Sequence, residues 1–232
     1  TPFFLATALV SAAAAISGVL MSVLDVAVDD AASVVAGLVV VGGGFVPALA
    51  FKLAGMRMPA LPTTAQQLQE NIDPYNGRDV ATRTELASGW MTALYAATGT
   101  ICGACLIALA RRPDLPEALT AIALTLLLLL HGRGMVHVWQ RLTLVVPGAW
   151  GAFLMIVGAA GSLGASDRPA FVAGLLALAA VLAILSWTVP GRRMLPYWGR
   201  AAEILHSLLA VALLPLTLWT LGLFGYLRSI MG

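Results

Sequence analysis

The stretch GWMTALYAATGTICGACLIALA, residues 89–110, contains no Asp, Glu, Lys or Arg. A helix needs about 20 consecutive apolar residues to cross the hydrocarbon core of a bilayer, so this stretch is long enough to span one. Five further stretches of similar length lack the same charged residues, and a seventh is shorter. The sequence therefore predicts an all-α, polytopic transmembrane helix bundle with about seven spans. The expected spans are residues 3–24, 31–51, 89–110, 116–132, 142–163, 169–189 and 204–227.

The overall composition favours a membrane location. Hydrophobic residues make up 60% of the 232 residues and charged residues only 10%, whereas a soluble domain carries roughly 25% charged residues. Because so few charges cannot cover a water-facing surface, most of the surface is expected to face lipid. The net charge of +2 gives no indication of nucleic acid as a partner.

The distribution of Lys and Arg predicts how the spans are oriented, because these residues accumulate in cytoplasmic loops. The charge-free part of the fourth segment, residues 118–130, is short enough to fit a re-entrant or buried helix as well. If all seven segments span and the N-terminus is cytoplasmic, nine Lys and Arg lie inside and four outside; if the fourth does not span, the split is six against seven. The first arrangement is favoured, with the N-terminus cytoplasmic and the C-terminus outside. The nine inner residues are Lys52, Arg57, Arg78, Arg83, Arg133, Arg141, Arg192, Arg193 and Arg200, and the four outer ones are Arg111, Arg112, Arg168 and Arg228.

One predicted cytoplasmic loop, residues 52–88, is much longer than the others and polar in its middle. Asp73–Pro74 and Asn76–Gly77 are turn signals within it. Thr82–Glu85 reads T-R-T-E, the pattern of a capping box, which predicts a helix start ahead of the third span. Long loops with signs of order are often functional, and a solvated connector is an equally good interpretation.

Two patterns that resemble metal or redox sites have simpler interpretations. Cys102 and Cys105 form a C-x-x-C motif in the middle of an expected span, where a thiolate is costly to form. Glu203 and His206 form half of a di-iron motif, which needs several further inward-facing Glu residues that the charge-free stretches lack. No nucleotide-binding loop, nucleophile elbow or metal cluster occurs in the sequence. We therefore expect no catalytic residue, no metal site and no cofactor, and a membrane enzyme is the least favoured reading.

Glycines inside the expected spans are predicted to pack helices together. Gly99 and Gly103 are four residues apart, the small-xxx-small spacing that lets two helices approach closely. Gly158 and Gly161 are interpreted in the same way. Cys102 and Cys105 are expected to act as small residues at the same helix contact.

Proline and glycine also predict local breaks. Pro47, Pro147 and Pro215 lie inside expected spans, and Gly42–Gly44 precede the first of them. A simple kink is the preferred interpretation. The alternative is a small-molecule secondary transporter with a midplane site at broken helices near Gly44, Pro147 or Pro215. Ion-coupled carriers usually keep a charged residue deep in a span, and the absence of one here argues against that alternative.

A polar cluster follows the fourth segment and comprises His131, Arg133, His137, Trp139 and Arg141. Arginine and aromatic residues commonly anchor helix ends at the membrane interface, and this is the preferred interpretation. The alternative is a pH-sensitive site or a site for lipid headgroups.

Two stretches resemble a known family. PYWGRAAEILHSLLAVALLPLTLWTLGLFGYLR, residues 196–228, resembles the C-terminal end of the EccD family, and NIDPYNGRDVATRTELASGW, residues 71–90, resembles the cytoplasmic loop before its seventh span. EccD proteins are integral membrane subunits of the type VII (ESX) secretion system of actinobacteria. The resemblance implies a cytoplasmic ubiquitin-like domain followed by eleven spans, so that this chain would supply spans five to eleven, with the ubiquitin-like domain and the upstream spans absent.

The resemblance also implies partners and a location. EccD subunits form dimers with a lipid-accessible cavity between the two copies, and they join EccB, EccC and EccE in the bacterial inner membrane, where EccC is the ATPase. The chain would then be a non-catalytic scaffold or channel-wall subunit that dimerises and holds the ATPase and the other core subunits. Partner contacts are expected in the long loop, because of its length, and before the last span, because Arg and aromatic residues cluster there. The candidate contact residues are Asp73, Tyr75, Arg78, Arg83, Arg192, Arg193, Trp198 and Arg200.

Overall fold

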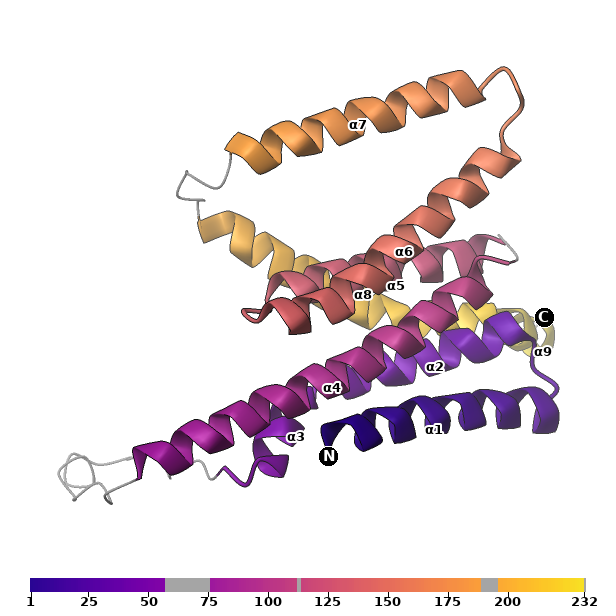
Figure 1. Ribbon diagram of the computed structural model, residues 1–232. Coiled ribbons are helices and arrows are strands. Elements are labelled where there is room, and N and C mark those ends of the chain that lie inside the picture. Colours follow the sequence, from indigo (N-terminus) through magenta and orange to yellow (C-terminus); the bar gives the residue numbers. More distant parts are fainter. Residues whose placement is uncertain (57–75, 112–113, 189–195, 232) are drawn as a thin grey trace.

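The computed structural model describes residues 1–56, 76–111, 114–188 and 196–231, and these residues form helices and short connections without a strand (Figure 1). An all-α fold is therefore confirmed. The helices are α1 (Pro2–Val23), α2 (Val28–Gly43), α3 (Val46–Leu53), α4 (Gly77–Leu109), α5 (Leu115–Arg133), α6 (Val138–Ser162), α7 (Arg168–Thr188), α8 (Pro196–Thr220) and α9 (Leu223–Met231).

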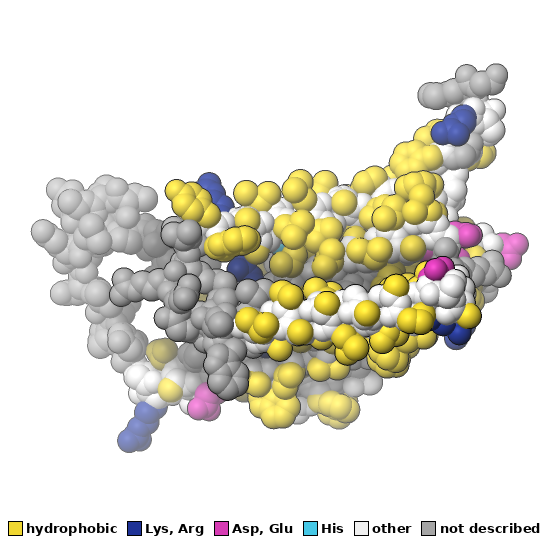
Figure 2. Space-filling view, turned by 90° about the horizontal axis from the view of Figure 1, so that it is seen from above, with side chains coloured by type: hydrophobic (Ala, Val, Ile, Leu, Met, Phe, Trp, Pro, Cys, Tyr) yellow, Lys and Arg dark blue, Asp and Glu magenta, His cyan; other side chains and the backbone are white. Residues whose placement is uncertain are grey.

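Most of these helices are long and apolar enough to cross a membrane. Within the described residues five helices meet this condition, namely α1, α4, α5, α6 and α8, and α2 with α3 makes a sixth span if the bent pair is counted as one. Helix α7 contains the apolar stretch Arg168–Ile184, which is shorter than the length set for a spanning helix. Figure 2 shows hydrophobic side chains over most of the visible face and charged side chains mainly toward its ends, as expected for a surface that faces lipid. The orientation in the membrane, with the N-terminus cytoplasmic and the C-terminus outside, remains a prediction.

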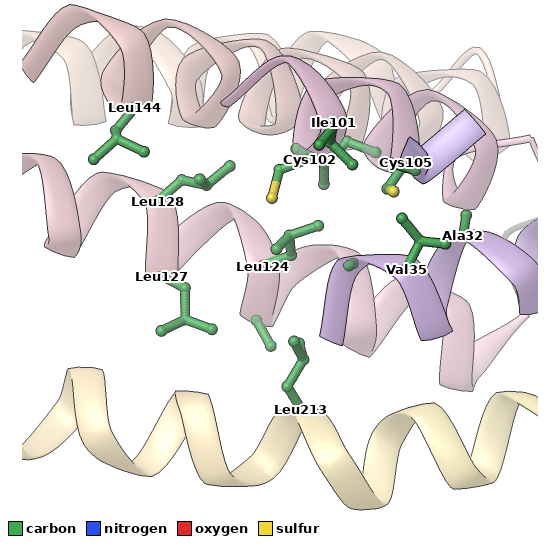
Figure 3. Close-up of a cluster of buried hydrophobic side chains, with 14 of the residues drawn as sticks. Ala32, Val35, Ile101, Cys102, Cys105, Leu124, Leu127, Leu128, Leu144 and Leu213 are labelled. Carbon is green, nitrogen blue, oxygen red and sulfur yellow. The ribbon is translucent and has the colours of Figure 1, made fainter. Parts of the chain in front are cut away.

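The core of the bundle lies around α4 and α5. Helix α4 packs against α1, α2, α3 and α6, and α5 packs against α6 and α8. Cys102 and Leu106 of α4 and Leu124 of α5 are fully buried between them, and Figure 3 shows Leu213 of α8 pointing toward the same cluster. Cys105 is buried as well, so both cysteines lie in the core as small apolar side chains.

The predicted break at the glycine run is present. Helix α2 ends at Gly43, α3 begins at Val46, and the two axes differ by 57°. Pro47 has no N–H group, so the carbonyl of Gly43 lacks the donor that a continuous helix would place four residues later. The missing hydrogen bond explains why the chain bends here instead of continuing as one straight helix.

The third long helix begins earlier than the sequence patterns indicated. Helix α4 starts at Gly77, so residues 77–88 of the expected loop are helical. The side chain of Asn76 caps the helix by accepting a hydrogen bond from the backbone N–H of Arg78 at 3.1 Å. The capping box expected at Thr82–Glu85 is therefore wrong, because these residues lie inside the helix and the Thr82 hydroxyl donates to the carbonyl of Arg78.

The Asn76→Ala variant is expected to fray the first turn of α4 without unfolding the bundle. An N-cap asparagine is worth about 1 kcal/mol, and its loss leaves helix N–H groups without an acceptor. Hydrogen exchange should accelerate over residues 78–80 and stay unchanged over residues 94–106. The Thr82→Ala variant is the matched control and should leave exchange in the first turn unchanged; faster exchange in that variant alone would contradict the assignment of the cap.

Helix α7 stands apart from the rest of the molecule. In Figure 1 the second half of α6 leaves the bundle and α7 returns at a distance from the other helices. No residue of α7 whose side chain is described is buried, and α7 has no extended packing against another described helix. Residues 156–183 of the α6–α7 hairpin thus project from the packed bundle, whereas Leu154 and Met155 still pack against the core.

Candidate functional site

Four of the eight predicted contact residues, Asp73, Tyr75, Arg192 and Arg193, lie outside the described residues and stay predictions. The other four lie in the first turns of two long helices, Arg78 and Arg83 in α4 and Trp198 and Arg200 in α8.

Arg83 is already engaged within the chain. Its Nε donates to Oδ2 of Asp79 at 3.0 Å, one helical turn earlier, and its Nη1 donates to the carbonyl of Gly55, just after α3. Both partners of the ion pair are solvent-exposed, so the pair itself contributes little stability. Arg83 instead ties the end of α3 to α4, beside an open cavity of about 690 Å³ that Lys52 also lines.

The start of α8 presents aromatic and basic side chains to the surface. Trp198 is 67% exposed and Tyr197 is 78% exposed, and Arg200 and Arg78 are exposed as well. Exposed tryptophan, tyrosine and arginine are the residue types that most often dominate protein interfaces. Of the predicted contact residues that are described, Arg78, Trp198 and Arg200 are therefore available to a partner.

The predicted packing glycines have different surroundings. Gly99 is buried, and a Cβ atom there would overlap the backbone of Thr143 and touch Pro147 of α6. Gly103 also faces Pro147, at an ordinary contact distance of 3.5 Å for an added Cβ. Gly158 and Gly161, in the part of α6 that leaves the bundle, have nothing within 4 Å of an added Cβ. The role of these two glycines in packing therefore stays a prediction, because a second protein surface would have to supply the contact.

A buried carboxyl group lies at the first turn of α5. Glu117 is only 7% exposed, and its Oε2 finds no hydrogen-bond partner among the described residues. A negative charge in the first turn of a helix interacts favourably with the helix dipole, which accounts for an acidic residue here. Sequence patterns placed this residue at the edge of a span and gave no sign of its burial.

Three polar rings from different helices meet inside the bundle, which sequence reasoning did not foresee. His131 Nδ1 of α5 lies 3.2 Å from His206 Nε2 of α8, and His131 Nε2 lies 3.4 Å from the hydroxyl of Tyr95 of α4. The two imidazole centroids are 5.3 Å apart. His131 therefore turns inward to these rings, whereas Arg133, His137, Trp139 and Arg141 are exposed, and their role as interface anchors stays a prediction.

The ring cluster lines a cavity of about 190 Å³ beside the α2–α3 break, where Gly43 and Gly44 form part of its wall. The cluster offers two imidazoles and a phenol and no carboxylate or thiol. Within the part of the chain that the structure describes, no group of three His, Cys, Asp or Glu side chains could hold a metal ion. The arrangement can donate, accept and take up protons, and it provides hydrogen bonds between α4, α5 and α8.

Comparison with known proteins assigns the chain to a family. A family model described as an EccD-like transmembrane domain matches residues 1–230. Among solved structures, one chain in the structure of protomer 1 of the ESX-3 core complex has a similar fold, with a TM-score of 0.67 and 16% sequence identity. That match covers 95% of this chain and 51% of the other, so the chain spans about half the length of its structural relative. A search of curated proteins finds no significant match.

The family match confirms the resemblance carried by residues 71–90 and 196–228, and it extends that resemblance over nearly the whole chain. Together with the apolar helices, it identifies a multi-pass protein of the inner membrane. The chain belongs to the EccD family, and the match to the family's transmembrane domain extends over residues 1–230.

Proposed function

We propose that this chain is a scaffold or channel-wall subunit of a type VII secretion complex, which dimerises and holds the ATPase and the other core subunits. The family match and the fold shared with a protomer of the ESX-3 core complex support this role. It is a role in assembly, carried out by packing surfaces and loops and not by catalysis.

The observation that carries the proposal is the projecting α6–α7 hairpin. Exposed apolar side chains alone mean little in a membrane, because lipid tails are as apolar as leucine. The hairpin adds a different observation, because residues 156–183 bury no described side chain and therefore leave a helical surface open to another protein. A second protein surface, such as another copy of the subunit, would supply the missing van der Waals contacts, and Gly158 and Gly161 would let its helix approach closely.

The other partners are assigned to the aqueous ends of α4 and α8. Arg78, Trp198 and Arg200 are exposed there, and Asp73, Tyr75, Arg192 and Arg193 are predicted to extend the same surfaces. EccB-, EccC- and EccE-like subunits are the proposed occupants, on the strength of the family assignment.

The test is an affinity purification of the tagged full-length protein from membranes in mild detergent, followed by native mass determination and identification of the co-purifying subunits. Recovery in a large assembly that contains an ATPase supports the scaffold. Recovery as a lone monomer, under conditions that keep other membrane complexes intact, contradicts it.

A small-molecule transporter is the second candidate, because a cavity does lie at the glycine-rich break where that function predicted one. Its volume of about 190 Å³ is smaller than the roughly 300–1,000 Å³ of typical ligand pockets. A second cavity of about 320 Å³ meets the break at Gly42 and Gly43, but Thr98 is the one polar side chain in its described lining. A small cavity on one side and a nearly apolar cavity on the other favour a structural role for the break.

A further inference from the structure

Helix α8 is held to the bundle by polar contacts at two separate places. In its first half, His206 meets His131 of α5 at 3.2 Å, and His131 in turn contacts Tyr95 of α4. We call these three residues the histidine latch. In its last turns, the Thr220 hydroxyl lies 2.7 Å from the buried hydroxyl of Ser33 of α2.

The two contacts differ in one chemical respect. The contact between Ser33 and Thr220 joins two hydroxyl groups, which do not titrate in the physiological range. Thr217 adds a hydroxyl that donates to the carbonyl of Ser33 at 3.4 Å, and it too does not titrate. The histidine latch contains two imidazoles, the side chains whose charge changes most readily near neutral pH.

The number of protons on the two imidazoles determines whether the hydrogen bond between His131 and His206 persists. The neutral pair carries two ring protons, one of which lies between His131 Nδ1 and His206 Nε2. A third proton can occupy an outer nitrogen, so the shared hydrogen bond survives single protonation. A fourth proton places N–H groups on both facing nitrogens, which removes the bond and leaves two positive charges on rings 5.3 Å apart.

The surroundings offer no charge that would compensate this state. Besides the two histidines, the cavity is lined by apolar or uncharged residues and the phenol of Tyr95. The other lining residues are Val40, Gly43, Gly44, Thr98, Leu127, Leu128, Leu144 and Ala210. Glu203 of α8 and Arg133 of α5 are on the histidines' own helices and are exposed, so solvent screens them.

A proline lies between the two contacts. Pro215 is inside the continuous helix α8, between His206 and Thr217, and its missing N–H leaves the carbonyl of Val211 without its helical donor. Proline is the commonest cause of a sharp bend in a helix. A bend at this position would displace the first half of α8, in which Leu213 is the one buried side chain among the described residues, while the last turns stay attached to Ser33.

We propose that the histidine latch is a pH-sensitive device, in which double protonation of His131 and His206 releases the first half of α8 from α5 while the contact between Ser33 and Thr220 holds its other end. The released half carries the exposed surface of Trp198 and Arg200, so acidification would move the surface that the proposed function assigns to partners. The device itself does not depend on that assignment.

The experiment measures two distances by double electron–electron resonance in the full-length protein, in lipid nanodiscs, with Cys102 and Cys105 replaced by alanine. One spin-label pair, at the exposed positions Ala201 and Leu86, reports the first half of α8. The other pair, at Leu218 and Val23, reports its last turns. Lowering the pH from about 7.5 to about 4.5 should raise the population of a displaced first half about tenfold and leave the second distance unchanged.

Matched variants separate the latch from general acid effects. In His206→Gln the side chain still hydrogen-bonds His131 but cannot become charged, so the response to pH should disappear. The response should persist in His137→Gln, which removes an exposed histidine outside the latch, and in Thr220→Val, which weakens the other contact. An unchanged first distance in the parent protein, or a full response in His206→Gln, would overturn the proposal. Because neither readout requires a partner, these outcomes are independent of whether the secretion complex forms.

Discussion

Replacing Gly99 with alanine is expected to destabilise the helix bundle by about 2–3 kcal/mol, because the added methyl group overlaps the backbone of α6 at Thr143. Gly99 lies in the centre of the contact between α4 and α6, and the atom that obstructs the methyl group belongs to the main chain. A flexible side chain could rotate away, whereas here the whole of α6 must shift. That shift also disturbs Leu144, which is fully buried one residue further along α6.

The measurement is equilibrium unfolding of the purified protein in mixed detergent micelles, followed by far-ultraviolet circular dichroism. Gly103→Ala is the matched control, four residues along the same face, where an added Cβ meets Pro147 at the ordinary distance of 3.5 Å. It should unfold within about 1 kcal/mol of the parent protein, since alanine favours helix over glycine. Equal stability of both variants would show that Gly99 does not set the distance between the helices.

The sequence predicted the helical class because the signal lies in single segments. Residues 89–110 are apolar throughout, and no tertiary information is needed to recognise a helix that faces lipid. The short fourth segment required the distribution of Lys and Arg as well, because its apolar length alone also fitted a re-entrant or buried helix; α5 extends it at both ends, to Leu115 and Arg133. The glycine run before Pro47 was also sufficient to predict the bend, since proline acts on its own helix.

The start of α4 was mispredicted because two local signals competed. Asn76–Gly77 was taken as a turn, and Thr82–Glu85 as a cap. Asparagine favours both turns and N-caps, and sequence alone does not tell which role it plays. Thr82 and Thr84 lie inside α4, where backbone N–H groups have helical acceptors and need no cap, and their hydroxyls donate to carbonyls one turn earlier.

The histidine latch could not be predicted because it depends on tertiary contacts. Tyr95, His131 and His206 come from three helices, separated by 36 and 75 positions in the chain. Each residue alone is ordinary: a tyrosine in an apolar helix, and histidines near helix ends. Only the packing of α4, α5 and α8 brings their polar atoms together, and periodicity along one helix carries no information about that packing.

The double substitution Gly158→Leu with Gly161→Leu is expected to weaken self-association of the full-length protein at least about tenfold, a loss of roughly 1.4 kcal/mol or more. Two leucines on the projecting part of α6 would hold a docking helix away from the surface that the glycines leave open. The fold of the subunit itself should survive, because an added Cβ at either position meets nothing within 4 Å. Leucine also has a higher helix propensity than glycine, so α6 should be no less helical.

The oligomeric state is measured by native mass spectrometry and by single-molecule photobleaching of labelled subunits in native-lipid particles. Gly18→Leu is the matched control, since Gly18 is another exposed glycine of a spanning helix with nothing within 4 Å, located on α1 and away from the hairpin. If the hairpin is the dimer surface, the double variant becomes monomeric and the control keeps the parent state. If both remain dimeric, the subunits meet elsewhere and α7 is in contact with lipid or another subunit; if both become monomeric, added bulk in any span is enough to disrupt assembly. Only a monomeric double variant together with a dimeric Gly18→Leu control assigns the interface to the hairpin. In that case the loss of the dimer depends on where the leucines lie and not on the added side-chain volume.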